Sequence, residues 1–370
     1  MFRAHTPASA CKLLALGTNG GPAGRDPYGK LTAMMQKCCL AALAATLVSW
    51  AGAASGQTFE TVGTRAAGMG GAFVAVADDA SAAYWNPAGL AAGNFFTMVL
   101  DRTAVKVDPG GSSEGAASGS GSLVSLGMPA LGLSYYRVRT TTLTPRALTT
   151  AANSDGRKGL EAGDVRRDTL ITHHSGATLV QSIVPGLAVG ATLKLVRGIA
   201  TSTVVLDGDR GELLDDASEL TGKGTSRVDL DLGVMATRGR VKAGLTVRNV
   251  MQPAFSTAGE SGRLMLRRQA RAGVAVVLVS GWVVAGDLDV TRTPAPGGSM
   301  RSLAAGTEGR VGRKAFVRGG LRVNTAGSRQ PVVAAGGSYA VMGSLLLDAQ
   351  VTGGSDRAQR GWGLAARFVY

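Results

Sequence analysis

Three short residue patterns could do chemistry in this chain of 370 residues. Asp287 and Asp289 are separated by one apolar residue, Leu288. In a β-strand both carboxylates therefore lie on the same face and could bind a cation. Ion pairing with Arg or Lys of neighbouring strands is the alternative, and we favour it. His173 and His174 are adjacent, so in a strand their rings face opposite sides and cannot chelate one metal ion together. A position near a loop or an interface suits these histidines better.

A glycine-rich stretch, Gly68-Met-Gly-Gly, matches part of a dinucleotide-binding loop. It lacks the full G-x-G-x-x-G spacing and a preceding buried strand, so we set that interpretation aside. Asp78 and Asp79 could pair with arginines or cap local turns, and the sequence leaves both roles open. No Ser/His/Asp set, Cys/His set or cluster of metal ligands stands out in the sequence. We therefore expect no enzymatic activity, no metal site and no cofactor.

Strands with two unlike faces must position most of the charged residues. Valine and leucine occupy every second position from 228 to 234, and Asp229 and Asp231 stand between them. A charge on the lipid-facing side of a barrel costs about 2–4 kcal/mol for Arg or Lys near the midplane, so such charges belong in a polar lumen. Opposite signs there predict hydrogen-bonded pairs between neighbouring strands. The residues that we assign to the lumen are Asp229, Asp231, Lys242, Arg248, Arg271, Asp287, Asp289, Glu308, Arg318, Arg322 and Arg367.

The connections between these strands are alternately short and long. The short ones fall near residues 129–130, 185–186, 238–240, 280–281, 312–313 and 342–343. The long ones fall near residues 108–118, 141–166, 207–225, 251–263, 294–299, 325–330 and 354–359. This alternation is typical of a meander barrel with short turns at one end and longer loops at the other. We predict an all-β fold, a transmembrane up-and-down antiparallel barrel of about 14 strands over residues 95–370.

The last ten residues, 361–370, read as the closing strand of this barrel. Trp362, Phe368 and Tyr370 lie on one wholly apolar face, while Arg367 lies on the other. Such a strand suits lipid on the outside and a polar lumen on the inside.

The first 56 residues read as a region that is removed on export. Residues 38–50 form the longest apolar run, preceded by a lysine and followed by small residues, which is typical of a secretory signal peptide. We expect residues 34–56 to be that signal and residues 1–33 to be an over-extended start. All three cysteines fall in this region. The remainder carries 34 basic and 24 acidic residues, a net charge of +10. A basic lumen, or loops facing an anionic leaflet, suits an exported chain better than a nucleic-acid partner.

Residues 61–93 contain a set of small, acidic and turn-forming residues that is fairly specific. Its members are Arg65, Gly68, Gly70, Gly71, Phe73, Asp78, Asp79, Asn86 and Pro87. Through these residues the chain resembles the outer-membrane barrel superfamily of FadL-type hydrophobic-compound transporters and PorV/PorQ proteins, and is similar to its TraF-like members. The resemblance implies that residues 57–94 fold as a small plug inside the barrel. It also implies that Trp362, Phe368 and Tyr370 form a signal that the outer-membrane assembly machinery recognises.

The resemblance leaves two functions open. The first is passive transport of small hydrophobic compounds across a Gram-negative outer membrane. The second is a non-enzymatic, PorV-like role in secretion, conjugation or surface assembly, with the barrel as a docking platform. The partners expected are outer-membrane lipid, the assembly machinery, and either a small hydrophobic substrate or a secretion partner. An apolar cavity beneath the loops at 141–166 and 207–225 would favour transport, whereas a lumen packed shut by its charges would favour the second role.

Overall fold

The computed structural model describes most of the chain. The described residues are 61–107, 115–145, 164–206, 209–215, 224–259, 262–278, 281–295, 298–327, 329–354 and 359–370. The predicted over-extended start, the signal peptide and residues 57–60 of the predicted plug lie outside this range, as do most of the loops predicted at 108–118, 141–166 and 207–225.

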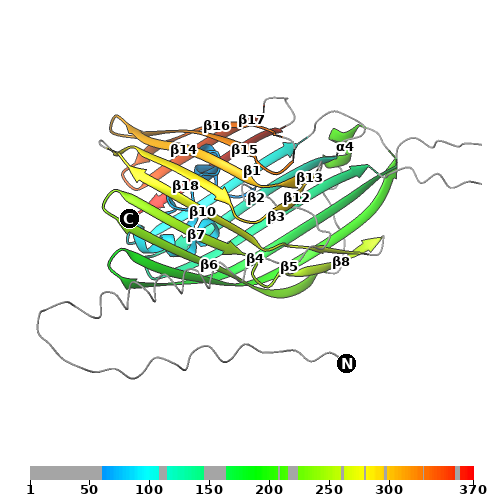
Figure 1. Ribbon diagram of the computed structural model, residues 1–370, viewed down its shortest axis with the longest axis horizontal. Helices are drawn as coiled ribbons and strands as arrows, with labels where there is room; N and C mark the ends of the chain where they lie inside the picture. Colours follow the sequence, from blue (N-terminus) through cyan, green and yellow to red (C-terminus); the bar gives the residue numbers. More distant parts are fainter. Residues whose placement is uncertain are drawn as a thin grey trace, which may run out of the picture. The chain divides into compact units, whose positions relative to one another are not determined.

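Fourteen antiparallel strands close into one barrel, as predicted from the turn pattern. The first strand pairs with the last, from Thr97 opposite Val369 to Val107 opposite Gln359. Figure 1 shows the strands running side by side. The barrel strands are β1 (Thr97–Val107), β2 (Ala116–Gly127), β3 (Leu131–Pro145), β4 (Asp164–Val184), β5 (Leu187–Leu206), β6 (Thr225–Arg238), β7 (Val241–Arg248), β10 (Gln269–Val277), β11 (Val283–Asp289), β14 (Ser302–Val311), β15 (Ala315–Asn324), β16 (Val332–Met342), β17 (Leu345–Gly354) and β18 (Gln359–Val369).

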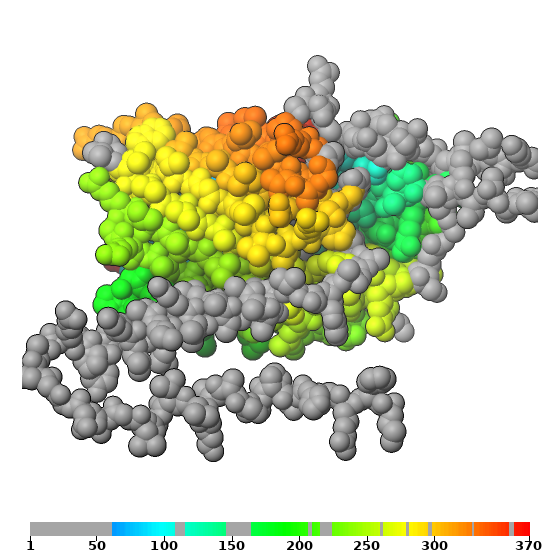
Figure 2. Space-filling model, in the orientation of Figure 1, coloured from blue at the N-terminus to red at the C-terminus, as the bar shows by residue number. Residues whose placement is uncertain are grey.

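Alternation of the side chains gives the barrel wall two different surfaces. On β5, the outward Leu193 and Leu195 are 57% and 54% exposed, whereas Thr192 and Lys194 between them are buried. The same period-two contrast runs through the other strands, which is the reason why these segments form strands rather than helices. Figure 2 shows part of the outer wall, in yellow and orange, where residues of β10 to β16 form a continuous surface. Tight turns close the hairpins at one end; Gly186 and Gly239 take positive φ angles of 82° and 59° there.

Residues 61–93 form an inner segment that the barrel encloses (Figure 1, blue). Its elements are α2 (Thr64–Gly68), α3 (Ala82–Trp85) and the 3₁₀ helix η2 (Pro87–Ala92). Phe73 and Trp85 pack edge to face with ring centroids 5.8 Å apart, and both are completely buried. They belong to one apolar cluster with wall residues such as Leu123 and Tyr136. The core of the protein is therefore the space between the inner segment and the wall.

Two of the predicted long loops contain further strands. The connection predicted at 251–263 holds β8 (Ala254–Gly259) and the start of β9 (Arg263–Met265), and β8 pairs in parallel with residues 200–202 of β5. Since β5 extends beyond its pairing with β6, which ends at Gly198 opposite Thr225, it has a free edge that β8 covers. The connection predicted at 294–299 is a small hairpin of β12 (Thr293–Ala295) and β13 (Gly298–Met300).

The remaining described helix is α4 (Arg210–Asp215), in the connection between β5 and β6. Among the helices that the structure describes, none has the length and apolar character needed to cross a membrane.

Candidate functional site

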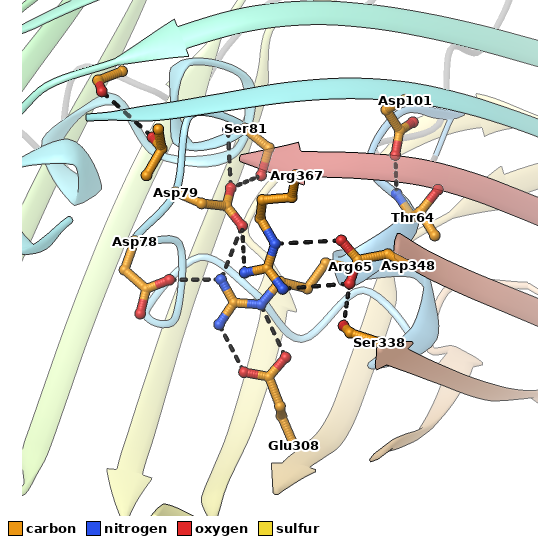
Figure 3. Close-up of polar contacts among 12 residues, drawn as sticks. Thr64, Arg65, Asp78, Asp79, Ser81, Asp101, Glu308, Ser338, Asp348 and Arg367 are labelled. Atoms are coloured by element: carbon orange, nitrogen blue, oxygen red, sulfur yellow. Dashed lines mark hydrogen bonds and ion pairs between the residues drawn. The ribbon is translucent and has the colours of Figure 1, made fainter. Parts of the chain in front are cut away.

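The inner segment contacts the wall through several sets of polar side chains. The largest set, which we call the Arg65 network, contains three guanidinium groups and four carboxylates. Figure 3 shows Arg65 and Arg367 of this network with its four carboxylates. Its members are Arg65, Asp78 and Asp79 of the inner segment, with Glu308, Arg318, Asp348 and Arg367 of the wall.

Arg65 joins the inner segment to β14. Its guanidinium donates from Nε and Nη2 to the two carboxylate oxygens of Glu308, at 2.9 and 2.7 Å. The third nitrogen, Nη1, donates to Asp78 at 2.6 Å and to Asp79 at 2.9 Å. A two-pronged arginine–carboxylate contact of this kind fixes both the position and the orientation of the guanidinium plane. The short α2 helix presents Arg65 toward β14, and this helix is itself buried.

The network continues around the wall over β15, β17 and β18. Arg318 contacts Glu308 and also reaches Asp348 at 3.2 Å. Arg367 of the closing strand lies 3.3 Å from Asp348 and 3.5 Å from Asp79. The chain of charges therefore returns to the inner segment, so that each wall arginine bridges two carboxylates. With four carboxylates to three guanidinium groups, the negative charge is largely, but not completely, balanced.

Opposing effects act on the protonation of the two inner-segment groups. Burial alone would raise the pKa of the Asp79 carboxyl, but Arg65 and Arg367 hold this pKa below its ordinary value. Burial also disfavours the charged guanidinium of Arg65, yet the carboxylates of Asp78 and Glu308 raise the pKa of Arg65 well above its ordinary value. Both groups are therefore charged at neutral pH, and the network is ionic.

Backbone groups of the inner segment bind two further wall carboxylates. Asp101 of β1 accepts hydrogen bonds from the amides of Gly63 and Thr64, at 3.2 and 2.6 Å, beside the start of α2. Asp287 of β11 accepts from the amides of Phe73 and Val74, both at 2.8 Å. These bonds satisfy amides that the tightly turned inner segment leaves without a helical partner.

Asp289 and Asp287, the pair considered as a cation site, have different partners. Asp289 pairs with Arg271 of β10 at 2.6 Å, in the way that the ion-pair alternative predicts. Asp287 instead binds the backbone of the inner segment, which the sequence did not suggest. Arg271 also donates to the carbonyl of Gly71 at 3.2 Å, so it bridges the wall and the inner segment. Among the described residues, no group of three or more His, Cys, Asp or Glu side chains is arranged to hold a metal ion.

Asn86, which precedes Pro87 in the inner segment, binds the wall in addition to fixing a local turn. The Asn86 amide nitrogen donates to the carbonyls of Val74 and Val234, at 2.9 and 3.1 Å. Its side-chain oxygen accepts from the amide of Ala88 at 3.2 Å and so caps η2, with Pro87 in the first turn. Asn86 therefore links two parts of the inner segment to β6.

Close backbone approach depends on glycines whose missing side chains would point inward. A Cβ atom on Gly320 of β15 would lie 2.2 Å from the carbonyl carbon of Met69. Gly70 approaches the same strand and takes a positive φ of 67°. Gly68 lies against Gly336 of β16 in a similar way. The inner segment thus touches the strand backbones themselves.

A second buried ionic set, the Lys194 network, lies on the wall of β5, β6 and β7. Lys194 is 3.0 Å from Asp229 and 2.7 Å from Asp231, and all three side chains are buried. Arg248 lies 3.8 Å from Asp231, and its guanidinium stacks 3.5 Å from the ring centroid of Tyr84 in the inner segment. This network therefore holds the inner segment through an aromatic ring rather than through a carboxylate.

Six of the eleven predicted lumen charges belong to these two networks, and Arg271, Asp287 and Asp289 make the contacts described above. The other two, Lys242 and Arg322, belong to neither network. Lys242 is half-buried near the short-turn end of β7 and makes no ion pair with a described residue. Arg322 is half-buried on β15, toward the longer loops. Of the terminal aromatics, Trp362, Phe368 and Tyr370 are exposed on the outer surface, and Phe368 packs edge to face on Phe96.

Asp78 and Asp79 take both of the roles that the sequence left open. Both pair with Arg65 of the inner segment, and Asp79 also lies 3.5 Å from Arg367 of the lumen wall. Asp79 also accepts from the backbone amide of Ser81 at 2.9 Å and thereby caps a local turn. The two histidines face opposite sides: His174 is buried and stacks on Tyr136, and His173 faces outward.

Sequence reasoning missed several members of the site. Lys194 stands between two outward leucines, so the alternation on β5 predicts an inward lysine, and this signal could have been used. Asp101 and Arg102 are adjacent charges on β1, so alternation alone could not tell which of them faces the lumen. The inward glycines of the wall, such as Gly320 and Gly336, are visible in the sequence as small residues. The sequence does not show that the backbone of the inner segment packs against them.

One family model matches part of the chain. The family described as "F plasmid transfer operon, TraF, protein" matches residues 176–289, which run from β4 to the end of β11. No curated protein matches the chain.

Several solved barrels share the fold. The CymD monoaromatic hydrocarbon channel matches with a TM-score of 0.56 and 14% identity, covering 85% of this chain and 98% of CymD. A Pseudomonas aeruginosa FadL homologue matches with a TM-score of 0.58 and 11% identity, covering 85% and 99%. The P. putida toluene transporter TodX matches with a TM-score of 0.55 and 13% identity, covering 85% and 99%. The resemblance to FadL-type barrels is thus confirmed at the level of the fold.

Proposed function

We propose that this protein is an outer-membrane barrel through which small hydrophobic compounds pass, with the inner segment as its gate. The observation that carries the proposal is that residues 61–93 lie buried inside the barrel and, apart from their chain connection into β1, are held to the wall by non-covalent contacts, among them those of the Arg65 network. Similar barrels support the substrate class, since CymD is a monoaromatic hydrocarbon channel and TodX a toluene transporter. No catalytic step is part of this proposal.

Membrane placement is supported by the outer surface of the wall. Outward positions of the strands are occupied largely by exposed aliphatic and aromatic side chains, which a water-facing barrel would not favour. The closed ring of strands leaves no unpaired edge between β18 and β1, as a bilayer requires. We infer that the short turns face the periplasm and the longer connections face the cell exterior.

We infer that the gate opens when Arg65 gives up one of its carboxylate partners and keeps the others, rather than when Arg65 loses all of them. Breaking a buried ion pair and leaving one partner alone costs about 3–5 kcal/mol. Arg65 has three carboxylates within 2.9 Å, so loss of one still leaves it paired. A small displacement of α2 that separates Arg65 from Glu308 but retains Asp78 and Asp79 would open a path along β14 at lower cost. In this arrangement, Glu308 is the wall contact that closes the gate.

Uptake into liposomes tests the proposal. The processed protein is compared with a variant that lacks residues 57–94, using a hydrophobic dye for flux and single-channel conductance for an open pore. We expect slow dye uptake with the full protein and at least tenfold faster uptake, with a measurable conductance, after the deletion. Equal absence of flux from both folded proteins would contradict transport.

A second function is favoured by one specific observation. The described lumen is closed by two buried ionic networks, and the TraF family model matches part of the same barrel. A closed barrel could serve as a docking platform for a secretion, conjugation or surface-assembly system, as PorV-like proteins do. Co-purification of a defined exported partner with a barrel that never conducts, even without residues 57–94, would favour this role over transport.

A further inference from the structure

We propose that the outer surface of strands β1 to β5 is a binding site for a phosphorylated lipid, with the headgroup phosphate on a row of basic residues and an acyl chain in the apolar groove below. The inference rests on the membrane placement proposed above, but not on transport. It concerns the outside of the barrel, whereas the Lys194 side chain, whose residue also borders the groove, is buried on the inner side with its carboxylate partners.

The basic row follows the register of the sheet. Arg137 of β3 stands opposite His173 of β4, and His173 stands opposite Arg197 of β5. In the other direction, Arg137 is opposite Ser122 of β2, which is opposite Arg102 of β1. Neighbouring strands lie about 4.8 Å apart, so these side chains form one line across the wall. All of them alternate with buried residues and therefore point outward.

The charge of this row is not balanced by the described part of the protein. Neither Arg137 nor Arg197 forms an ion pair with a described residue, and Arg102 and Arg197 are exposed. Ser122 separates Arg102 from Arg137, and His173 separates Arg137 from Arg197, so three guanidinium groups share one line of the wall. The hydroxyl of Ser122 offers a neutral donor within the row. A phosphate group, with several acceptor oxygens, matches this set of donors.

The outward charges of the other strands can be compared with those of this row. The outward positions of β7, β10, β11 and β14 to β17 carry no charged residue, and Figure 2 shows part of that side. Apart from Arg238 at the short-turn end of β6, outward cations among the described barrel strands gather instead on β18, β1, β3, β4 and β5. Beyond the row, toward the longer loops, they include Lys106, Arg139 and Arg360. A general attraction to an anionic leaflet would act around the whole wall, so cations gathered on one side favour a ligand that binds at that side.

An apolar groove of about 570 Å³ lies directly below the row. This volume falls in the range of roughly 300–1,000 Å³ that is typical of small-molecule sites. Tyr135 connects the two parts, since its ring lines the groove and its hydroxyl lies 2.7 Å from Nδ1 of His173. The groove is lined by Val124, Leu133, Tyr135, Leu193, Leu195 and Val228, among others.

The combination of row and groove selects the occupant. A free anion would need the basic row alone, and an apolar solute would need the groove alone. An acidic protein segment would place charges on the row but would leave the groove without a matching chain. A membrane lipid whose phosphate headgroup has a net negative charge supplies both parts in the same order along the wall, with the charged group toward the longer loops and the acyl chain toward the short turns.

Native mass spectrometry of the full processed protein in detergent tests this site. The probes are phosphatidic acid, zwitterionic phosphatidylcholine, inorganic phosphate and a short poly-glutamate peptide. The variant R137Q/R197Q removes two charges of the row. The matched control R238Q/R240Q removes two exposed arginines at the short turn between β6 and β7. A third variant, Ala177→Trp, fills the groove, since Ala177 lies exposed in its lining.

We expect the native protein and the R238Q/R240Q control to retain phosphatidic acid at least tenfold better than R137Q/R197Q and than Ala177→Trp. We also expect weak retention of phosphatidylcholine and inorganic phosphate. Equal retention by native protein and R137Q/R197Q would overturn the site. So would equal retention of the two lipids, phosphate binding as tight as lipid binding, or displacement of the lipid by poly-glutamate. Heat-modifiable gel migration verifies that each variant is folded, and no outcome depends on dye flux, so the failure of transport and the failure of this site are separable.

Discussion

Arg65 of the inner segment donates two hydrogen bonds to Glu308 of β14, across 243 positions of the chain. This contact is the most direct tie between the inner segment and the wall, because both oxygens of the carboxylate are engaged. It has no local origin in the sequence, so it forms only when the barrel is closed around the segment. The Arg65–Glu308 pair is therefore formed only when the inner segment lies in its place against the wall.

Glu308→Gln should loosen the inner segment. The substitution leaves Arg318 and Arg65 facing a neutral amide in a buried site, but both keep other carboxylates, so the cost should lie below the roughly 3–5 kcal/mol of a fully unpaired buried charge. We expect a lower free energy of unfolding in urea and faster protease cleavage within residues 61–93. The matched control is Glu212→Gln on α4, an exposed carboxylate outside the network, which should change neither quantity. Equal stability of the two variants would show that the pair does not hold the segment.

Gly320→Ala should also displace the inner segment, but for a steric reason. The added Cβ would lie 2.2 Å from a backbone atom of Met69, a distance that requires the segment to move. Overpacking of this kind costs about 1–3 kcal/mol. Gly319→Ala is the control on the same strand, since its Cβ would meet nothing within 4 Å. Thermal unfolding of both variants should show a lower Tm for Gly320→Ala alone; a matching drop in both would refute close contact at Met69.

The stability of the folded protein should fall in acid because of Asp79. Its pKa is lowered in the folded state relative to an ordinary value of about 3.9, so its contribution is complete above that pH. The contribution is lost as the pH falls through the folded pKa, since protonation then removes the charge that pairs with Arg65 and Arg367. The free energy of unfolding should therefore decrease from about pH 4 downward.

Asp79→Asn should flatten part of that acid dependence. The control Asp164→Asn replaces an exposed carboxylate at the start of β4 and should leave the dependence as it is. Urea titrations at a series of pH values measure the effect. An unchanged slope in Asp79→Asn would mean that Asp79 is not the group responsible.

Removal of Phe368–Tyr370 should impair insertion of the barrel into the outer membrane. These residues pair with the start of β1, where Tyr370 exchanges backbone hydrogen bonds with Phe96 at 2.9 and 3.1 Å. The truncation removes both this closure and the exposed aromatics that we expect the assembly machinery to read. Heat-modifiable migration of membrane fractions measures insertion, with Trp362→Ala as a variant that keeps the terminal pairing. Normal insertion of the truncated chain would argue against a terminal signal.

The sequence was sufficient for the barrel and for much of its lumen. Alternation places Asp229 and Asp231 inside and the flanking valines and leucines outside because a strand has only two faces. It could not predict β8, since the pairing of β8 depends on how far β5 extends past its neighbour. The partners of Asp287 could not be predicted either, because they are backbone amides, which every residue except proline has.

A disulfide between the inner segment and the wall tests the central claim most directly. A Cβ on Gly363 of β18 would lie 2.7 Å from Oγ1 of Thr64 in α2, so the two thiols of the variant T64C/G363C would be close enough to form a disulfide. Dye uptake into liposomes is measured under oxidising conditions and again after reduction, beside the two single variants. If the inner segment is the gate, uptake falls at least tenfold when the cross-link forms and returns when it is reduced. Uptake that is the same in both states, with the cross-link verified, would contradict the account.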